Sequence, residues 1–206
     1  MAREKAVVVG AGGISGAWFP PLLAEKVNVV GVVDMNVEAA QKRIEQYDLK
    51  CEASSDLASL LKKTQPDFVV DLTIPDAHYT VTTTALKLGF PVIGEKPMAA
   101  SMAQARKMVK TSEDSGKLYM VSQSRRWNAH HDVTQRVLKS GVLGEITTVN
   151  CDFYLGCHFG GFRDEMESPL ILDMAIHHFD QARFFTGLDP VAVYAHEFNP
   201  KGSWYK

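Results

Sequence analysis

Residues 5–16 read KAVVVGAGGISG, an apolar β-branched run that leads straight into a glycine-rich turn. Gly10, Gly12 and Ser15 occupy the three small-residue positions of the GxGxxG/A pattern that follows the first strand of dinucleotide-binding folds. The first glycine allows a tight turn, the second lets a pyrophosphate approach the backbone, and a small third residue lets the helix pack closely against its strand. This stretch therefore predicts a strand, a phosphate-binding turn and the start of a helix.

The same turn and the next apolar run contribute three more candidate cofactor-binding residues. Gly13 and Ile14 lie at the predicted helix N-terminus, whose free N–H groups and positive dipole attract phosphate. Asp34 ends the run VNVVGVVD, 24 positions after Gly10. A carboxylate there accepts hydrogen bonds from the ribose hydroxyls and repels a 2′-phosphate, which favours NAD over NADP. The alternative is that Asp34 only caps the following helix.

Short apolar runs alternate with longer helical patterns through the first 122 residues, which is typical of a parallel sheet with helices on both faces. The predicted strands lie within residues 5–10, 27–34, 66–75, 90–95 and 117–122. We expect an α/β fold in which residues 1–122 form a Rossmann domain with a doubly wound parallel sheet.

The pattern changes after Gln123. Residues 132–141 and 170–187 have helical periodicity, whereas residues 144–156 and 190–198 alternate as antiparallel strands do. We therefore expect residues 123–206 to begin an α+β domain with a mostly antiparallel sheet. One helix and two strands leave such a sheet incomplete, so we expect this domain to be truncated.

The run FPVIGE is followed by Lys96 and Pro97, and this turn is open to two interpretations. It is either a solvated strand end or a point where Glu95 and Lys96 are held at the carboxyl edge of the sheet, near the glycine turn. Pro75 ends the preceding predicted strand and His78 opens the next helix at the same edge, and both are candidate cofactor-binding residues. An ordinary helix start explains those two residues equally well.

The second half of the chain offers candidates for acid–base chemistry. Asp173 and His177 are four apart in a predicted helix and so share one face. A carboxylate beside an imidazole orients it and stabilises its protonated form, as a general acid or base requires. The alternatives are a structural hydrogen bond, or a metal site completed by His158 or Cys157. We expect no metal, because no HxxxH or clustered cysteine spacing supplies further ligands.

Two arginines are candidates for substrate binding. Arg126 lies in the sequence QSRRWNAHH at the predicted domain junction, where cationic and aromatic groups suit a polar substrate. A solvated linker explains this stretch equally well. Arg163 lies in a glycine-bearing loop before the Asp173 helix, within reach of a hydroxyl or carboxylate.

Composition narrows the choice of partners. The 24 acidic and 22 basic residues give a net charge of −2 and are mixed along the chain, so no basic field attracts nucleic acid or anionic lipid. No run of about 18 apolar residues predicts a membrane span. Three cysteines form neither an even disulfide set nor a CxxC pair, which favours a reducing compartment, and we expect a cytoplasmic location.

Taken in order, these features resemble the Gfo/Idh/MocA oxidoreductase family, which includes glucose-fructose oxidoreductase and inositol dehydrogenases. They are the glycine-rich start, the acidic end of the second strand, a Pro and His after the fourth strand of the Rossmann pattern, GEKP after the fifth, and a D-x-x-x-H helix. The resemblance covers the chain from about Ala6 to Ala195. It implies hydride transfer between NAD and a sugar, inositol or polyol CH–OH group.

The resemblance also implies individual roles. Lys96 would hydrogen-bond the reacting hydroxyl, His177 would exchange its proton, and Asp173 would orient substrate and histidine, with Glu95 and Pro97 setting the Lys96 backbone. The implied dinucleotide contacts are Gly10, Gly12, Ile14, Asp34 and His78.

This sequence departs from the family pattern at three places. Ala175 replaces the glycine of D-x-G-x-H, the usual glycine run before that helix reads MESPLIL, and the chain ends after its early strands. Family chains continue into a sheet that forms the oligomer interface, so a homo-oligomer is expected of a complete chain. Two other functions remain open: an NAD-dependent glycoside hydrolase of the same family, or a non-catalytic dinucleotide-binding protein.

Overall fold

The computed structural model describes residues 3–203. Residues up to Ser122 form one compact unit, termed unit 1, and residues from Gln123 onward form a second, termed unit 2.

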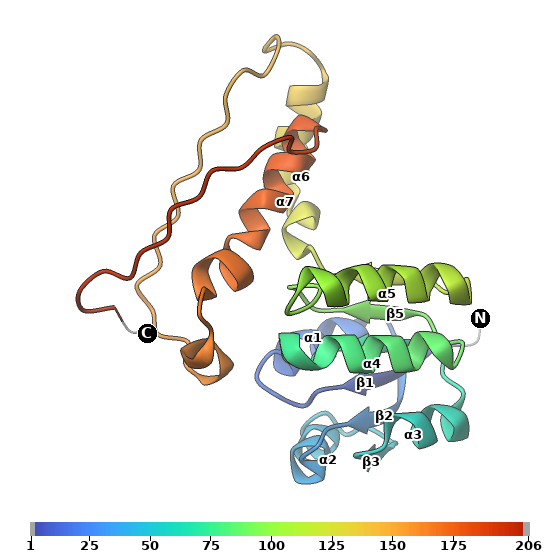
Figure 1. The fold of residues 1–206 in the computed structure, drawn as a ribbon. Helices are drawn as coiled ribbons and strands as arrows, with labels where there is room; N and C mark the ends of the chain where they lie inside the picture. Colours follow the sequence, from blue (N-terminus) through green and yellow to red (C-terminus); the bar gives the residue numbers. More distant parts are fainter. Residues whose placement is uncertain (1–2, 204–206) are drawn as a thin grey trace. The chain divides into compact units, whose positions relative to one another are not determined.

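Unit 1 is built on a six-stranded sheet whose hydrogen-bonded neighbours are all parallel, in the order β3-β2-β1-β4-β5-β6 (Figure 1). The strands are β1 (Lys5–Val9), β2 (Asn28–Val33), β3 (Glu52–Ser54), β4 (Phe68–Asp71), β5 (Val92–Gly94) and β6 (Tyr119–Val121). The helices between them are α1 (Ser15–Ala24), α2 (Val37–Gln46), α3 (Leu57–Thr64), α4 (Pro75–Lys87) and α5 (Met102–Ser115). Strand, helix and strand alternate throughout, so the predicted Rossmann sheet is confirmed.

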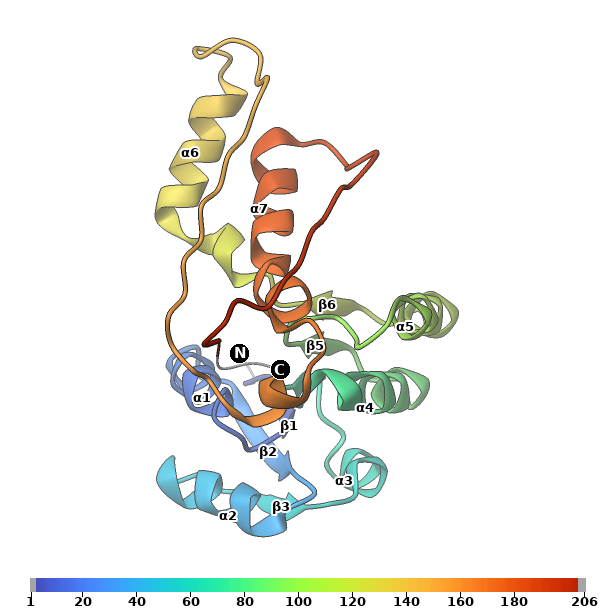
Figure 2. The same cartoon turned by 60° about the vertical axis from the view of Figure 1, so that its left-hand side comes forward.

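Alternation of side chains along β1 creates a core on each face of the sheet. Ala6 and Val8 join one buried cluster with residues of α1 and α2, and Val7 and Val9 join another with residues of α3 and α4. Figure 2 shows α1 and α2 on one side of the strands and α3 and α4 on the other. Because both faces are covered, β1 is apolar at every buried position, as expected for a central parallel strand.

The strand order reverses between β1 and β4. The chain leaves β1 toward β2 on one side and leaves β4 toward β5 on the other. Ligands of open α/β sheets bind outside the carboxyl ends of the strands at such a switch point. The glycine-rich turn follows β1, so the fold places it at this position.

The sequence patterns missed one strand of unit 1. The edge strand β3 has only three residues, Glu-Ala-Ser, and no apolar run marks it. Its pairing with β2 is a consequence of the chain returning along the sheet edge.

Unit 2 contains helical elements only, within the part of the chain that the structure describes. They are η1 (Ser124–Trp127), α6 (Ala129–Lys139), η2 (Gly161–Glu165), the π-helical turn η3 (Leu170–Met174) and α7 (Ile176–Thr186). The helix predicted over residues 170–187 is therefore interrupted. The N–H of Ala175 donates to the carbonyl of Leu170 at 2.7 Å, which is the i→i−5 bond of a π turn.

The antiparallel strands predicted over residues 144–156 and 190–198 are not confirmed. Both segments are irregular in the structure, and the side chains of Tyr154, Val191 and Tyr194 are at least 90% exposed. An alternating pattern favours a strand only where a neighbouring strand pairs its backbone and covers one face. Among residues 123–203 no such neighbour is present. No helix in the described chain is both long and apolar enough to span a membrane.

We predict that Gly10→Ala destabilises the protein by roughly 1–3 kcal/mol or more. Gly10 has φ +98°, and an added Cβ would lie 2.7 Å from both the carbonyl carbon and oxygen of Leu72. Urea denaturation followed by circular dichroism would measure the change. Gly12→Ala is the matched control: no atom lies within 4 Å of its added Cβ, so a change within about 0.5 kcal/mol is expected. Equal effects of the two substitutions would contradict this account of the turn.

Candidate functional site

The glycine-rich turn is held by hydrogen bonds to the sheet and to its own helix. The N–H of Gly10 donates to the carbonyl of Val33 at 2.7 Å, and the Ser15 hydroxyl donates to the carbonyl of Gly12 at 2.7 Å. Ser15 is fully buried, so a small third residue is what allows α1 to approach the sheet. The turn thus has the packing that the GxGxxG/A pattern predicts.

The turn also leaves room and donors for phosphate. Among the described residues, no atom lies within 4 Å of a Cβ added at Gly12 or Gly13. Within residues 3–203, the backbone N–H groups of these two glycines donate to no other group. Open backbone and unused amide donors at the start of a helix are what a dinucleotide pyrophosphate requires. These residues therefore fit the cofactor that the sequence pattern predicts.

Asp34 bridges the end of β2 to the turn. Its carboxylate accepts hydrogen bonds from the N–H groups of Ala11 at 2.7 Å and Asn36 at 2.8 Å. The side chain that caps α2 is Asn36, which accepts from the N–H groups of Glu38 and Ala39, so the simple helix-cap alternative for Asp34 is wrong. Each carboxylate oxygen keeps a further lone pair for a ribose hydroxyl. The preference for NAD over NADP stays a prediction.

The backbone around Lys96 is fixed by a contact from a distant helix. The Trp18 indole Nε1 on α1 donates to Glu95 Oε1 at 2.7 Å, and the N–H of Lys96 donates to Glu95 Oε2 at 3.1 Å. The N–H of Glu95 donates to the carbonyl of Asp71 at 2.8 Å, which ties the turn to β4. The GEKP stretch is therefore an anchored strand end and not a freely solvated turn. The chemical role of Lys96 stays a prediction.

His78 lies in a buried polar cluster at the end of β4. Its Nδ1 is 3.2 Å from Asp71 Oδ1, and the hydroxyls of Thr73 and Thr82 donate to the same carboxylate at 2.6 and 3.1 Å. His78 is 1% exposed and Asp71 is fully buried. Pro75 is also buried and begins α4. Contacts of Pro75 and His78 with a dinucleotide stay predictions, and the observed contacts of His78 are internal to unit 1.

In unit 2, Asp173 lies on the π turn and is paired with Arg163. The Arg163 Nε donates to Asp173 Oδ2 at 2.6 Å, and Asp173 is 1% exposed. The guanidinium also lies over the rings of Phe159 and Phe162, with 5.3 and 4.5 Å to the ring centres. One donor of Arg163 is thus committed to Asp173. The contact of Arg163 with substrate stays a prediction, and it would use the other nitrogens of the guanidinium.

The adjacent histidines His177 and His178 have different surroundings. His177 lies in the first turn of α7 and is half-buried. His178 Nε2 is 3.2 Å from Arg125 Nη1, and its ring packs at 4.6 Å from that of Phe153. Burial, followed by the positive charge of Arg125, lowers the pKa of His178. The Nε2 lone pair of His178 accepts from Arg125, and the role of His177 in proton transfer stays a prediction.

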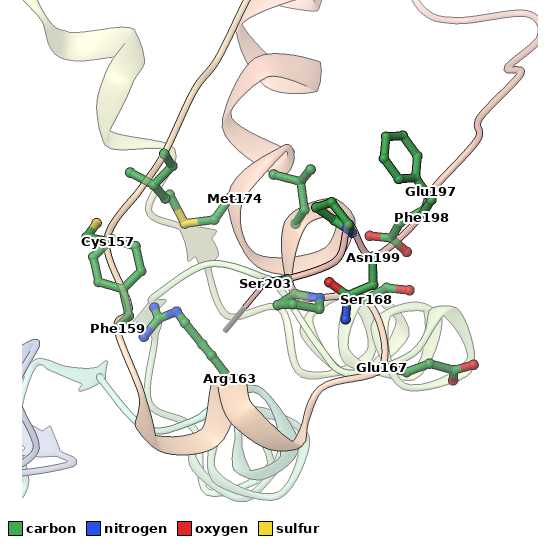
Figure 3. Close-up of a pocket in the computed structure, with 14 residues that line it drawn as sticks. Cys157, Phe159, Arg163, Glu167, Ser168, Met174, Glu197, Phe198, Asn199 and Ser203 are labelled. Atoms are coloured by element: carbon green, nitrogen blue, oxygen red, sulfur yellow. The ribbon is translucent and has the colours of Figure 1, made fainter. Parts of the chain in front are cut away.

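A cavity of about 460 Å³ in unit 2 is lined on one side by Arg163 (Figure 3). Its lining is mixed, and the charged side chains that line it are Arg163, Glu167 and Glu197. The apolar wall includes Leu155, Phe159, Leu170, Met174 and Phe198. Cavities of this size and character suit small organic ligands.

Arg126 forms an internal ion pair. Its Nε and Nη2 donate to the two oxygens of Asp180 at 2.7 and 2.6 Å, and its guanidinium lies 5.4 Å from the centre of the Phe184 ring. The hydrogen bond to Asp180 raises the pKa of Arg126. This bidentate geometry ties η1 to α7. The predicted substrate contact of Arg126 stays a prediction, and the observed contact is structural.

The alternative of a metal site finds no set of ligands in the described residues. His158 contacts Asp164 at 2.6 Å, and no group of three or more His, Cys, Asp or Glu side chains suited to a metal ion occurs among residues 3–203.

Two family models cover most of the chain. Residues 5–123 match the model described as "Oxidoreductase family, NAD-binding Rossmann fold", and residues 131–202 match the "GFO/IDH/MocA C-terminal domain". The chain belongs to the Gfo/Idh/MocA family. This membership confirms the resemblance and makes the glycine-rich turn part of an NAD-binding Rossmann fold.

Several relatives that resemble this chain are named as inositol or sugar dehydrogenases. Inositol 2-dehydrogenase 1 of Paenarthrobacter aurescens is 29% identical over 92% of this chain and 56% of its own length. D-glucoside 3-dehydrogenase of Escherichia coli is 29% identical over 97% of this chain and 59% of its own length. The chain thus spans little more than half the length of these relatives.

Two solved structures share the fold of this chain. The myo-inositol dehydrogenase of Lactobacillus casei, in complex with NAD(H) and myo-inositol, has a TM-score of 0.77 and 22% identity over 90% of this chain and 55% of its own. The myo-inositol 2-dehydrogenase of Lactobacillus plantarum has a TM-score of 0.79 and 18% identity over 92% of this chain and 58% of its own.

Sequence reasoning missed three side chains at the carboxyl edge of the sheet. Trp18 holds Glu95, Asp71 organises the cluster around His78, and Arg43 donates to carbonyls of the glycine-rich turn. No local pattern marks Trp18 or Arg43, because each contacts residues more than 30 positions away. Asp71 offered one signal, a carboxylate at the end of an otherwise apolar strand.

We predict that Arg126→Ala loosens α7, because it leaves the carboxylate of Asp180, which is 8% exposed, without its bidentate partner. The free energy of local opening should fall by roughly 1–3 kcal/mol. Hydrogen–deuterium exchange of α7 followed by mass spectrometry would measure it. Arg183→Ala is the control, since its pair with Asp189 is exposed and should contribute less than about 1 kcal/mol. Similar exchange in both variants would show that the Arg126 pair does not hold the helix.

Proposed function

We propose that this protein transfers a hydride between NAD and a CH–OH group of a sugar, inositol or related polyol. The observation that carries the proposal is the anchored GEKP turn. Trp18 and Glu95 hold the backbone of Lys96 at the carboxyl end of β5, on the same sheet edge as the glycine-rich turn and Asp34. Relatives named as inositol and glucoside dehydrogenases support the substrate class.

In this proposal, unit 1 binds the cofactor. The N–H groups of Gly12 and Gly13 would bind the pyrophosphate, and Asp34 would accept hydrogen bonds from the adenosine ribose. When bound, NAD supplies the hydride acceptor. A carboxylate at the position of Asp34 disfavours the 2′-phosphate of NADP by charge repulsion.

Lys96, His177 and Asp173 would act on the substrate. The Lys96 ammonium would donate a hydrogen bond to the reacting hydroxyl and stabilise the oxygen as negative charge develops. His177 would accept the hydroxyl proton as the C–H hydride leaves, so that the alcohol becomes a ketone and two electrons and one proton pass to the cofactor. The hydrogen bond from Arg163 would hold the Asp173 carboxylate in its orientation.

A second function is favoured by one observation. Unit 2 has no strand among residues 123–203, whereas unit 1 has a six-stranded parallel sheet with the glycine-rich turn after β1. A dinucleotide-binding protein without turnover is therefore the alternative. The deciding experiment incubates the 206-residue chain with NAD or NADP and a panel of inositols, free sugars and glycosides while NADH formation and NAD binding are followed separately. NAD binding with no reaction on any substrate would favour the alternative, and aglycone release without net NADH would indicate the glycoside hydrolase.

We predict that Lys96→Ala lowers turnover by about 100-fold or more, because the developing oxyanion loses its cation. The NAD dissociation constant should change less than about twofold. Steady-state kinetics and ligand titration would measure the two quantities. Lys87→Ala, which removes an exposed lysine from α4 of the same unit, should leave both unchanged. An active Lys96→Ala protein would refute the assigned role.

We predict that Asp34→Ala lowers the preference for NAD over NADP by about tenfold or more, because the ribose hydroxyls lose an acceptor and the 2′-phosphate loses a repelling charge. Titration of both cofactors with the wild-type chain and the variant would measure the ratio. Glu38→Ala removes a neighbouring exposed carboxylate from α2 and should leave the ratio unchanged. An unaltered ratio in Asp34→Ala would rule out the ribose contact.

A further inference from the structure

Arg43 reaches from α2 onto the glycine-rich turn. Its Nε donates to the carbonyl of Ala11 at 3.2 Å, and its Nη2 donates to the carbonyl of Gly12 at 2.9 Å. Its remaining nitrogen, Nη1, donates to Gln46 Oε1 at 2.7 Å, which fixes the guanidinium on its own helix. Arg43 is half-buried and, among residues 3–203, its hydrogen bonds go to neutral oxygens.

Both polar backbone groups of Ala11 are hydrogen-bonded to side chains from other elements. Its N–H donates to Asp34 Oδ2 at 2.7 Å, and its carbonyl accepts from Arg43. A carboxylate from the end of β2 and a guanidinium from α2 therefore fix two successive peptide groups. The Gly12 carbonyl is held further by the Ser15 hydroxyl at 2.7 Å.

Holding these carbonyls also aims the amides that share their peptide planes. In a trans peptide the C=O and the following N–H point in opposite directions. With the carbonyls of Ala11 and Gly12 turned to Arg43, the N–H groups of Gly12 and Gly13 point away from it. These are the two amides that donate to no group within residues 3–203. A flip of either peptide would put a carbonyl dipole where a phosphate is to bind.

We propose that Arg43 is a positioning residue that orients the Gly12 and Gly13 amides toward the cofactor pyrophosphate. The inference rests on the proposed dinucleotide site. Arg43 acts through the peptide groups that it holds, so its effect is confined to the phosphates. The adenosine ribose depends instead on Asp34.

The test compares three ligands: NAD, ADP-ribose, which keeps the pyrophosphate, and adenosine, which lacks it. Isothermal titration or ligand-observed NMR would give each Kd for the wild-type chain and for Arg43→Ala. We expect NAD and ADP-ribose to bind about tenfold or more weakly to the variant, and adenosine to change less than about twofold. Arg43→Lys, with one ammonium in place of a fork that spans two carbonyls, should fall between wild type and Arg43→Ala.

Lys42→Ala is the matched control, because Lys42 is the neighbouring exposed cation on the same helix and, among residues 3–203, donates no hydrogen bond to the turn. It should leave all three affinities unchanged, which separates a positioning effect from a general loss of positive charge. Each titration is run at a temperature below the melting transition of the variant. If Arg43→Ala does not fold, the affinities of Arg43→Lys test the proposal in its place.

The outcomes separate the two proposals. If the wild-type chain binds neither NAD nor ADP-ribose, the proposed cofactor site and this inference both fail. If the wild type binds and Arg43→Ala keeps the wild-type affinities, or weakens all three ligands equally, the positioning role is overturned while the proposed function stands.

Discussion

The close approach of Gly10 to the backbone of Leu72 is the constraint on which the site depends. With φ +98° and no side chain, Gly10 lets the chain leave β1 against the end of β4 and donate its N–H to the carbonyl of Val33 in β2. The carboxyl ends of three adjacent strands are thereby joined at one turn. The glycine-rich turn of the proposed cofactor site starts from that junction.

Side chains from other elements then fix the orientation of the turns. Asp34 and Arg43 hold the glycine-rich turn from β2 and α2, and Trp18 holds Glu95 from α1. Each contact is made within unit 1. These contacts would preorganise the proposed cofactor site from within unit 1.

Unit 2 is organised differently, by charged pairs and a helix irregularity. Arg126 and Asp180 join η1 to α7, and Arg163 pairs with Asp173 on the π turn. A π turn widens the helix locally and is common where a helix carries functional side chains. The two irregular segments of unit 2, residues 144–156 and 190–198, have no strand to pair with among residues 123–203. The chain spans 56% of the length of the inositol 2-dehydrogenase and 59% of the length of the D-glucoside 3-dehydrogenase.

The sequence determined the Rossmann sheet, its glycine-rich turn and the family, because these depend on local patterns: an apolar strand, glycines at set spacing and an acidic strand end. It also placed Gly10, Gly12, Ser15 and Asp34 at the turn for the same reason. The strands of unit 2 could not be settled this way, since alternation becomes a strand only when another strand pairs with it.

Only the tertiary structure revealed the hydrogen bonds that Arg43 and Trp18 donate. The same holds for the two ion pairs of unit 2, Arg126 with Asp180 and Arg163 with Asp173. These contacts join residues 10 to 77 positions apart, and packing of one element against another determines which donor meets which acceptor. The sequence shows that an arginine is present but not which group its side chain contacts. The fold decides whether its guanidinium lies on a carboxylate, on a carbonyl of the glycine-rich turn or in solvent.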